Sequence, residues 1–351
     1  MQLLLLGGGH AHAGALLAFA KSPPGAQVKL VSPAPVHTYS GMVPGVIAGH
    51  YAPEEAQIDL ARLCGRAGAE LIVGSVAAIV AAARRVRLAD GRELPYDFAS
   101  LNLGSLPATA TPGSAQYAAG AKPFEHFFSQ WEAARAAVRR VAVVGGGAAG
   151  VEMAMAVRHR VPAAEVVLYS DRRMFEGRVE ARVEAALERC GVQLRRDMAV
   201  TAVEPGPTVV TAAAWRRVDF VLWVAGAASP PLLAASGLAT DAGGFALVDT
   251  SLRSVSHAEV FAAGDCASIL GHAHPKSGVY AVRHAPVLAA NLKAALRGHT
   301  LREYAPQRRQ LALLSCGGKY AIASRGRWSA EGAWCWRWKD WLDRRWLARF
   351  R

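Results

Sequence analysis

Short apolar runs recur along the chain, and most end in small or polar residues. Such runs occupy residues 3–6, 141–144, 166–169, 220–224 and 260–263, and residues 28–31 form a similar segment that is interrupted by Lys29. Uninterrupted apolar runs of about four to eight residues are typical of strands buried on both faces of a parallel sheet. An alanine-rich helix is expected after each of the runs at 3–6 and 141–144, and residues 124–138 have the composition of a further helix. The pattern predicts an α/β protein with parallel sheets.

Further strands are expected between these units. Residues 69–83 and 84–88 have the composition of two strands, and Asp90-Gly91 provides a hairpin turn behind them. Residues 96–105 predict a further strand that ends in small residues, including Gly104. Small residues at the end of a strand allow a ligand to approach the backbone.

Two of the apolar runs lead into glycine-rich turns. The turns read Gly7-Gly8-Gly9-His10-Ala11-His12 and Gly145-Gly146-Gly147-Ala148-Ala149-Gly150. In a strand–turn–helix unit the first glycine permits the tight turn and the second lets a pyrophosphate approach. The helix N-terminus then offers N–H groups to the phosphates. Each turn predicts a site for one dinucleotide, and a chain that holds two dinucleotides commonly passes electrons between them.

The two turns differ in completeness. Gly145, Gly147 and Gly150 satisfy the full spacing, whereas His12 stands at the third glycine position of the first turn. A histidine there either needs extra room between helix and strand or reaches toward the phosphates. Ser32 ends the second strand, where an acidic residue usually binds a ribose hydroxyl.

The choice between NADH and NADPH depends on the end of the second strand of the second unit. Ser170 falls twenty residues after Gly150 and is followed by Asp171, Arg172 and Arg173. An acidic residue there favours NADH, whereas arginines favour the 2′-phosphate of NADPH. The residues point both ways, and both nucleotides stay candidates.

Composition restricts the function classes. The chain has 351 residues, is 52% hydrophobic and carries a net charge of +13. Its five cysteines form no CxxC pair, which speaks against a zinc site, a disulfide framework and a thiol relay, and favours a reducing, cytoplasmic setting. Residues 1–20 lack the basic start of a signal peptide. His272 and His274 have no accompanying ligand cluster, so no metal site is expected.

The C-terminal region is rich in tryptophan and in positive charge. Residues 325–351 contain six of the nine tryptophans, and Trp334, Trp338 and Trp341 follow helical spacing. A basic amphipathic helix with aromatic anchors is typical of a helix lying in a membrane interface. The alternative is that these tryptophans pack on the protein or on a partner subunit. No nucleic-acid motif accompanies them.

Taken together, the motifs resemble those of pyridine-nucleotide-dependent flavoprotein reductases with two dinucleotide-binding domains, a class that includes type II NADH dehydrogenases. The residues that carry the resemblance are GGGHAH, YDFASLNLGS, VVGGGAAGVE, DFVLWVAGA and VFAAGDCA. Residues 37–45, 121–125 and 275–283 are similar to a subfamily that occurs alone or fused ahead of a selenide, water dikinase.

The resemblance implies two Rossmann-like domains, the second inserted in the first. FAD would bind residues 1–110 and 245–300, NAD(P)H would bind residues 111–244, and residues 301–351 would form an extension. Implied FAD contacts are Gly7, Gly9, His10, His12, Ser32, Gly104, Gly264, Asp265, Val279, Tyr280 and Ala281. Implied NAD(P)H contacts are Gly145, Gly147, Ala149, Gly150, Glu152, Ser170, Arg172 and Gly226.

Two residues are candidates for a catalytic role, although each has an ordinary alternative. Glu152 would begin the helix that faces the nicotinamide, or would simply favour the helix dipole. Lys122 would neighbour the flavin, or would be a solvated surface lysine.

The expected reaction passes hydride from NAD(P)H to flavin and electrons onward to a small non-disulfide acceptor, such as a quinone. A quinone acceptor would suit peripheral contact with the inner face of a membrane. The alternative is a flavoprotein partner in selenium metabolism. The sequence leaves the oligomeric state open.

Overall fold

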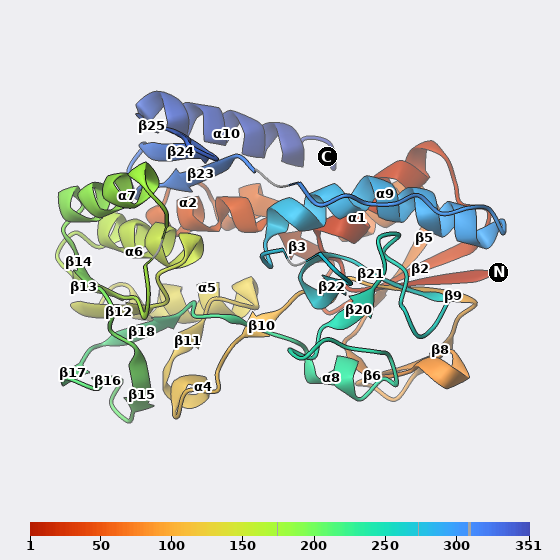
Figure 1. Ribbon diagram of the computed structural model, residues 1–351, viewed down its shortest axis with the longest axis horizontal. Coiled ribbons are helices and arrows are strands. Elements are labelled where there is room, and N and C mark those ends of the chain that lie inside the picture. The colour runs from red at the N-terminus through yellow and green to blue at the C-terminus, as the bar shows by residue number, and fades with distance from the viewer. Residues whose placement is uncertain (174, 273, 308–309) are drawn as a thin grey trace.

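The computed structural model contains two five-stranded parallel sheets that lie side by side (Figure 1). It describes residues 1–173, 175–272, 274–307 and 310–351. The predicted α/β class with parallel sheets is confirmed.

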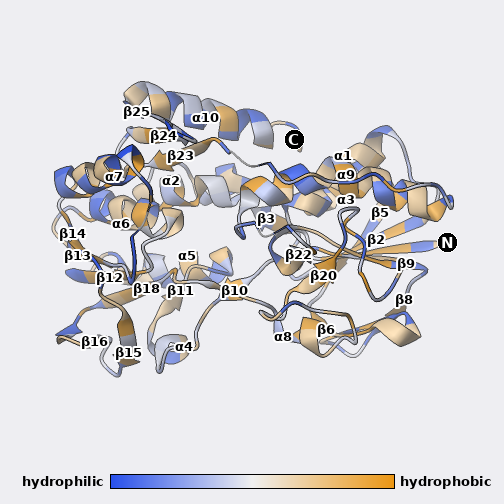
Figure 2. Ribbon diagram, viewed as in Figure 1, coloured by the Kyte–Doolittle hydropathy of each residue, from blue (hydrophilic) through white to orange (hydrophobic). Residues whose placement is uncertain are grey.

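The first sheet has the strand order β21-β9-β1-β2-β5. Its strands are β1 (Gln2–Leu6), β2 (Gln27–Ser32), β5 (Ala69–Val73), β9 (Phe98–Leu101) and β21 (Val260–Ala262). The central strand β1 pairs with β2 and β9, and Leu3 to Leu6 are fully buried. The strands of this sheet are largely hydrophobic, and Figure 2 shows orange in them.

Helices and a small sheet cover the two faces of this first sheet. The helices are α1 (His10–Lys21), α3 (Leu60–Ala67) and α9 (Gly278–Leu296), and the antiparallel strands are β6 (Val76–Val80), β7 (Arg85–Leu88) and β8 (Glu93–Pro95). A Cβ on Gly14 would lie 2.5 Å from the Cβ of Ala285, so glycine allows α1 and α9 to pack closely.

The second sheet has the order β11-β18-β12-β13-β14. Its strands are β11 (Ala119–Gly120), β12 (Arg140–Val144), β13 (Glu165–Tyr169), β14 (Val192–Arg195) and β18 (Phe220–Trp223), and its helices are α4 (Ser114–Tyr117), α5 (Phe124–Ala134), α6 (Ala148–Arg160) and α7 (Arg178–Arg189). An antiparallel sheet of β15 (Val200–Glu204), β16 (Thr208–Thr211) and β17 (Trp215–Arg217) follows.

The chain crosses between the two sheets twice, at a short antiparallel pair. Strand β10 (Leu106–Pro107) leads out and β19 (Ala227–Ala228) leads back. Leu233, in α8 (Pro231–Ala234), and Leu238 already pack in the first core, so the chain returns there ahead of residue 244. The parallel pair β20 (Ala246–Val248) and β22 (Ala267–Ile269) flanks β21.

The C-terminal extension bridges both units. It contains β23 (Ala312–Ser315), β24 (Ala321–Arg325), β25 (Trp328–Gly332) and α10 (Ala333–Leu347). Leu314 and Ile322 pack in the core of the second unit, whereas Leu347 and Phe350 pack in the core of the first. The helix predicted for the tail is present.

One predicted element is wrong. Residues 69–83, expected as a single strand, divide at Gly74 into β5 and β6. Strand β5 joins the parallel sheet, whereas β6 turns away into the antiparallel one. Within the described ranges, no helix has the length and apolar character needed to cross a membrane.

Candidate functional site

The first glycine-rich turn lies between β1 and α1 and is closed by Asn102. A Cβ on Gly7 would lie 2.4 Å from the Asn102 carbonyl oxygen, and one on Gly9 would lie 2.4 Å from Asn102 Oδ1. Asn102 Oδ1 accepts hydrogen bonds from the N–H groups of Ala11 and His12, at 3.1 and 3.3 Å. Its Nδ2 donates to the carbonyl of Ala263 at 2.8 Å. Asn102 thus fixes the helix start, a role that its place at the end of β9 could have suggested.

His12 is fully buried between helix and sheet. Its Nδ1 lies 2.7 Å from the Gly7 carbonyl oxygen, and its Nε2 lies 2.8 Å from Ser100 Oγ. Burial lowers the pKa of His12 to about 4, although the bond to Gly7 acts in the opposite direction. Of the two interpretations of this residue, the structure shows the one in which extra room accommodates the ring.

His10 and His37 form a side-chain pair at the start of α1. His10 Nδ1 lies 3.0 Å from His37 Nε2, with His37 on β3 (Val36–Thr38), which pairs with β4 (Gln57–Asp59). Burial lowers the pKa of His37 to about 4. The pKa of His10 is lowered well below its usual value, first by burial and then by His37. Ser32 is buried, and a Cβ on Gly8 would lie 3.1 Å from its hydroxyl.

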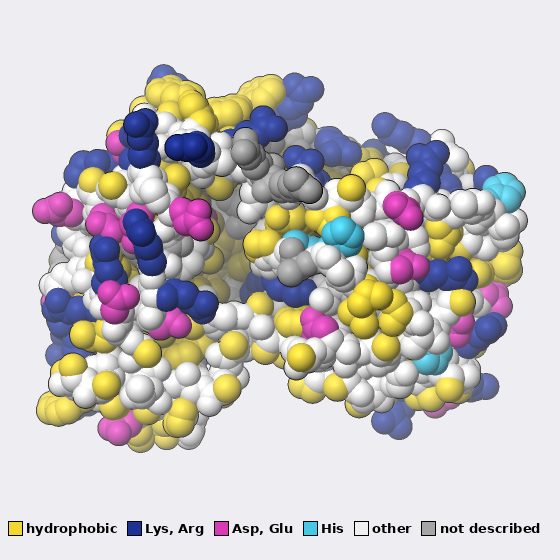
Figure 3. All heavy atoms as spheres, viewed as in Figure 1, with side chains coloured by type: hydrophobic (Ala, Val, Ile, Leu, Met, Phe, Trp, Pro, Cys, Tyr) yellow, Lys and Arg dark blue, Asp and Glu magenta, His cyan; other side chains and the backbone are white. Residues whose placement is uncertain are grey.

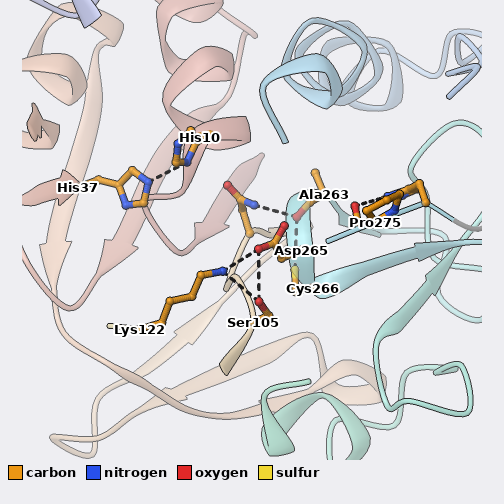
Figure 4. A network of polar contacts seen from close by, with 10 residues as sticks. His10, His37, Ser105, Lys122, Ala263, Asp265, Cys266 and Pro275 are labelled. Carbon is orange, nitrogen blue, oxygen red and sulfur yellow. Dashed lines mark hydrogen bonds and ion pairs between the residues drawn. The ribbon is translucent and has the colours of Figure 1, made fainter. Parts of the chain in front are cut away.

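Asp265 anchors a second polar group close to this turn (Figure 4). Its Oδ2 accepts hydrogen bonds from Lys122 Nζ at 2.9 Å and from Ser105 Oγ at 3.3 Å. Lys122 also donates to Ser105 Oγ at 3.1 Å. Lys122 is therefore a partner of Asp265 and not a free surface lysine. Gly264 donates its N–H to His284 Nδ1 at 3.0 Å.

The N-terminus of α9 faces the same region. A Cβ on Gly278 would lie 2.9 Å from Ser40 Oγ and 3.7 Å from His10 Nε2. Tyr280 and Ala281 are buried in the first turn of α9, whereas Val279 is 40% exposed. The N-termini of α1 and α9 and the segments after β9 and β21 therefore lie at one edge of the first sheet, which is called the first edge below.

The second glycine-rich turn has the geometry expected of a dinucleotide turn. A Cβ on Gly150 would lie 1.7 Å from the Gly145 carbonyl oxygen, so this position requires glycine for close packing. A Cβ on Gly147 would meet no atom within 4 Å, and Ala149 is exposed. The first turn of α6 is thus open at the carboxyl end of β12.

The residues that would select the nucleotide lie at the end of β13. Ser170 is buried, and its hydroxyl donates to the Arg172 carbonyl at 2.6 Å. Arg172 is exposed and pairs with Asp171 at 3.3 Å. Gly226, with a φ of 66°, lies after β18 at the same edge. An acidic and a basic side chain, Asp171 and Arg172, thus lie side by side at the position that would select NADH or NADPH.

Glu152 contacts the extension. Its Oε1 accepts a hydrogen bond from the Ser315 N–H at 2.8 Å. Burial raises the pKa of Glu152 to about 7, and Lys339 on α10 acts in the opposite direction. The carboxylate therefore has a specific partner beyond the dipole of α6.

The cysteines offer no disulfide relay beside Asp265. All five are free, and burial raises the pKa of the Cys266 thiol to about 11. Cys190 donates to the Cys316 carbonyl at 3.4 Å, a proximity that their spacing in the sequence did not reveal. Both lie on the α7 side of the molecule, and the pKa of each thiol is raised by burial. Among the described residues, no group of three histidine, cysteine or acidic side chains could hold a metal.

Both edges have features that fit a dinucleotide. Gly104 and Gly147 leave open space where a side chain would stand, and the first turn of α6 is exposed. At the first edge, His10 Nε2 and Ser277 Oγ are buried without a partner among the described residues. Polar atoms of this kind ordinarily have a hydrogen-bond partner, so a ligand with acceptor and donor groups suits this edge.

A family model described as pyridine nucleotide-disulphide oxidoreductase matches residues 1–285. The chain belongs to this family. This membership confirms the family that the sequence motifs predicted, a class of FAD-dependent oxidoreductases that use a pyridine nucleotide.

Two relatives agree with this assignment, and one solved structure has a similar fold. An NADH dehydrogenase-like protein of Mycobacterium tuberculosis is 29% identical over 234 residues, which are 60% of this chain and 58% of that protein. NADH dehydrogenase-like protein YutJ of Bacillus subtilis is 23% identical, with 91% of each chain covered. The sulfide:quinone oxidoreductase of Aquifex aeolicus has a similar fold, with a TM-score of 0.84, 18% identity and coverage of 100% of this chain and 91% of that one.

Proposed function

We propose that the protein oxidises NAD(P)H through FAD and passes the electrons to a quinone-type acceptor. The observation that carries the proposal is the pair of glycine-rich strand–turn–helix units in one chain, one at the start of α1 beside α9 and one at the start of α6. Bound FAD supplies hydride chemistry. The residues of the chain would orient the two dinucleotides.

Residues 1–110 and 245–300 would hold FAD, and residues 111–244 would hold NAD(P)H. Gly7, Gly9, His10, Gly104, Gly264 and Asp265 lie at or beside the first edge, and Gly145, Gly147, Gly150 and Gly226 at the second. Lys122 would orient FAD through Asp265, because the two side chains are paired at 2.9 Å.

The absence of a thiol pair beside Asp265 supports a non-disulfide acceptor. Cys266 is buried, its thiol donates to backbone carbonyls of Leu101 and Ala263, and its pKa is raised. A thiolate is the nucleophile in disulfide exchange, so this cysteine is poorly suited to that reaction.

Purified protein with its flavin provides the test. We expect NADH or NADPH to bleach the flavin absorbance without oxygen, and a water-soluble quinone to restore it faster than a disulfide does. A role only as a partner in selenium metabolism predicts a flavin that neither nucleotide bleaches. Rapid reoxidation by a disulfide would contradict the proposed acceptor class.

We further propose that the outer face of α10 contacts an anionic lipid surface, where a lipid-soluble quinone is available. Trp334 and Trp341 are 47% and 52% exposed, and the guanidinium of Arg345 lies 5.0 Å from the centre of the Trp341 ring. Figure 3 shows hydrophobic side chains over α10 with basic residues beside them. Exposed aromatic rings among basic residues match the chemistry of a lipid interface.

Vesicles containing phosphatidylglycerol test this contact. The double variant Trp334→Ala/Trp341→Ala should bind the vesicles at least about tenfold more weakly than the wild type. Trp215→Ala is the matched control, because Trp215 is 73% exposed on β17, far from α10 in Figure 1. Equal binding by all three proteins would refute the lipid contact.

A further inference from the structure

His10 has one ring nitrogen in a hydrogen bond and the other buried without a partner. Nδ1 lies 3.0 Å from His37 Nε2, whereas Nε2 has no partner among the described residues. His10 is 7% exposed, and His37 is half-buried. The pair therefore extends from a partly exposed residue to a buried nitrogen.

The buried nitrogen lies beside the N-terminus of α9. A Cβ on Gly278 would lie 3.7 Å from His10 Nε2 and 2.9 Å from Ser40 Oγ, so these groups meet at one point. On its other side the His10 ring stacks on Trp346, with ring centres 5.4 Å apart and an interplanar angle of 27°. The ring is thus held with Nε2 near the edge assigned to FAD.

The geometry of the pair allows a proton to cross it. Two facing ring nitrogens share one hydrogen, and which ring donates depends on the tautomers. When a proton arrives at the outer nitrogen of His37, the central hydrogen can move to His10 and a proton can leave from His10 Nε2. Both rings end in the opposite tautomer. The pair resets when His10 Nε2 takes up a proton from water that enters after the product leaves, the central hydrogen returns to His37, and the outer nitrogen of His37 releases its proton.

The surrounding charges favour neutral rings between transfers. Lys122 acts on both histidines and disfavours their cations, whereas Glu125, which accepts a hydrogen bond from Thr38, favours the cation of His37. Tyr39 packs against His10 and donates to Asp343, which is paired with Lys339. Burial contributes most to the lowered pKa of each histidine.

We propose that His10 and His37 form the proton-transfer pair of the acceptor reaction, with His10 Nε2 giving a proton to an oxygen of the quinone. This inference rests on the proposed function. Reduction of a quinone by NAD(P)H consumes one hydride and one proton and yields NAD(P)⁺ and a hydroquinone. NAD(P)H supplies both electrons with the hydride, the pair supplies the proton, and solvent returns a proton to His37.

The test compares two oxidants with different proton requirements. A quinone takes up protons when it is reduced, whereas ferricyanide takes up electrons alone. We expect His37→Phe to lower the ratio of quinone turnover to ferricyanide turnover at least about tenfold, because positioned acid–base groups contribute about 10²–10⁴-fold. His126→Gln, at an exposed histidine on α5, is the matched control.

Nitrogen NMR of the histidine rings gives a readout independent of turnover. In His37→Phe the Nδ1 resonance of His10 should shift, because its hydrogen bond is lost, and in His126→Gln it should stay in place. An unchanged oxidant ratio, or an equal fall with both oxidants, would overturn the proton-transfer role. If NAD(P)H fails to bleach the flavin of the wild type, it is the proposed function that fails.

Discussion

His12 shows how a single residue can alter a dinucleotide turn without destroying it. A glycine at this position would let helix and strand approach, whereas the imidazole fills the gap and bonds to Gly7 and Ser100. Because both ring nitrogens are used, the side chain is unavailable to a phosphate. Because burial lowers the pKa of His12, protonation of its ring in acid should destabilise the fold.

We predict that acid destabilises the protein between about pH 6.5 and pH 4, in part through His12. Its folded pKa is about 4, against 6.5 for an ordinary histidine. The unfolded chain therefore binds a proton first as pH falls, and stability decreases across that window. The difference between the folded and unfolded pKa values of His12 corresponds to a loss of about 3 kcal/mol of stability by pH 4. The free energy of unfolding, measured with urea across this pH range, should change less with pH for His12→Asn than for the wild type.

The control for this prediction is His299→Gln, at an exposed histidine. It should reproduce the pH dependence of the wild type. A His12→Asn protein with the same pH dependence as the wild type would mean that His12 protonates without cost in the folded state.

Glu152 should lower stability as pH rises, whereas His12 lowers it as pH falls. Its folded pKa is raised to about 7 from an ordinary value of 4.5. The folded protein therefore binds the proton more tightly, and this group lowers stability as pH rises from about 4.5 to about 7. We expect Glu152→Gln to remove that loss. The urea concentration at the midpoint of unfolding should therefore rise, relative to that of the wild type, between pH 5 and pH 8. A constant difference across this range would argue against the raised pKa.

At the scale of elements, two glycines of the turn between β12 and α6 differ in what requires them. Gly150 is required by the fold, because a Cβ there would collide with the Gly145 carbonyl. Gly147 has ordinary extended backbone, with φ of −70°, and faces open space. Since packing does not require glycine at 147, we predict that its role is to let a phosphate approach the backbone.

Two alanine variants distinguish these roles. Gly147→Ala should leave the free energy of unfolding within about 0.5 kcal/mol of the wild type. It should raise the KM for NAD(P)H about tenfold, because its methyl group occupies the approach to the backbone. Gly150→Ala should be destabilised by about 1–3 kcal/mol, the usual cost of overpacking. If Gly147→Ala binds nucleotide normally, the phosphate does not approach at this turn.

The strand–turn–helix units could be predicted from sequence because each is local. Apolar runs and glycine spacing correctly located β1, α1, β12 and α6. The groups that surround these turns could not be located in the same way. Asn102 reaches α1 from β9, His37 reaches His10 from β3, and Lys122 reaches Asp265 across 143 residues. Such contacts depend on how the sheets are assembled.

At the scale of the whole molecule, the extension joins the two dinucleotide units. Periodicity in the tail left open whether its tryptophans meet a membrane or the protein. The structure separates the two faces of α10: Trp334 and Trp341 are exposed, whereas Trp346 packs on Tyr39 and His10. Helical spacing alone could not reveal which residues would face inward, because tryptophans occur on both sides.

The inward face of α10 should therefore contribute to holding FAD, and Trp346 provides the test. Its ring lies 4.4 Å from Tyr39 and 5.4 Å from His10, centre to centre, so it fixes both side chains beside the α1 turn. Trp346→Ala should lose about 2–4 kcal/mol of stability and release FAD more readily in ultrafiltration. Trp341→Ala, on the outer face of the same helix, should retain FAD as the wild type does. Equal retention by both variants would show that α10 stabilises the fold without supporting the cofactor, whereas selective loss from Trp346→Ala would tie the C-terminal helix directly to the FAD site.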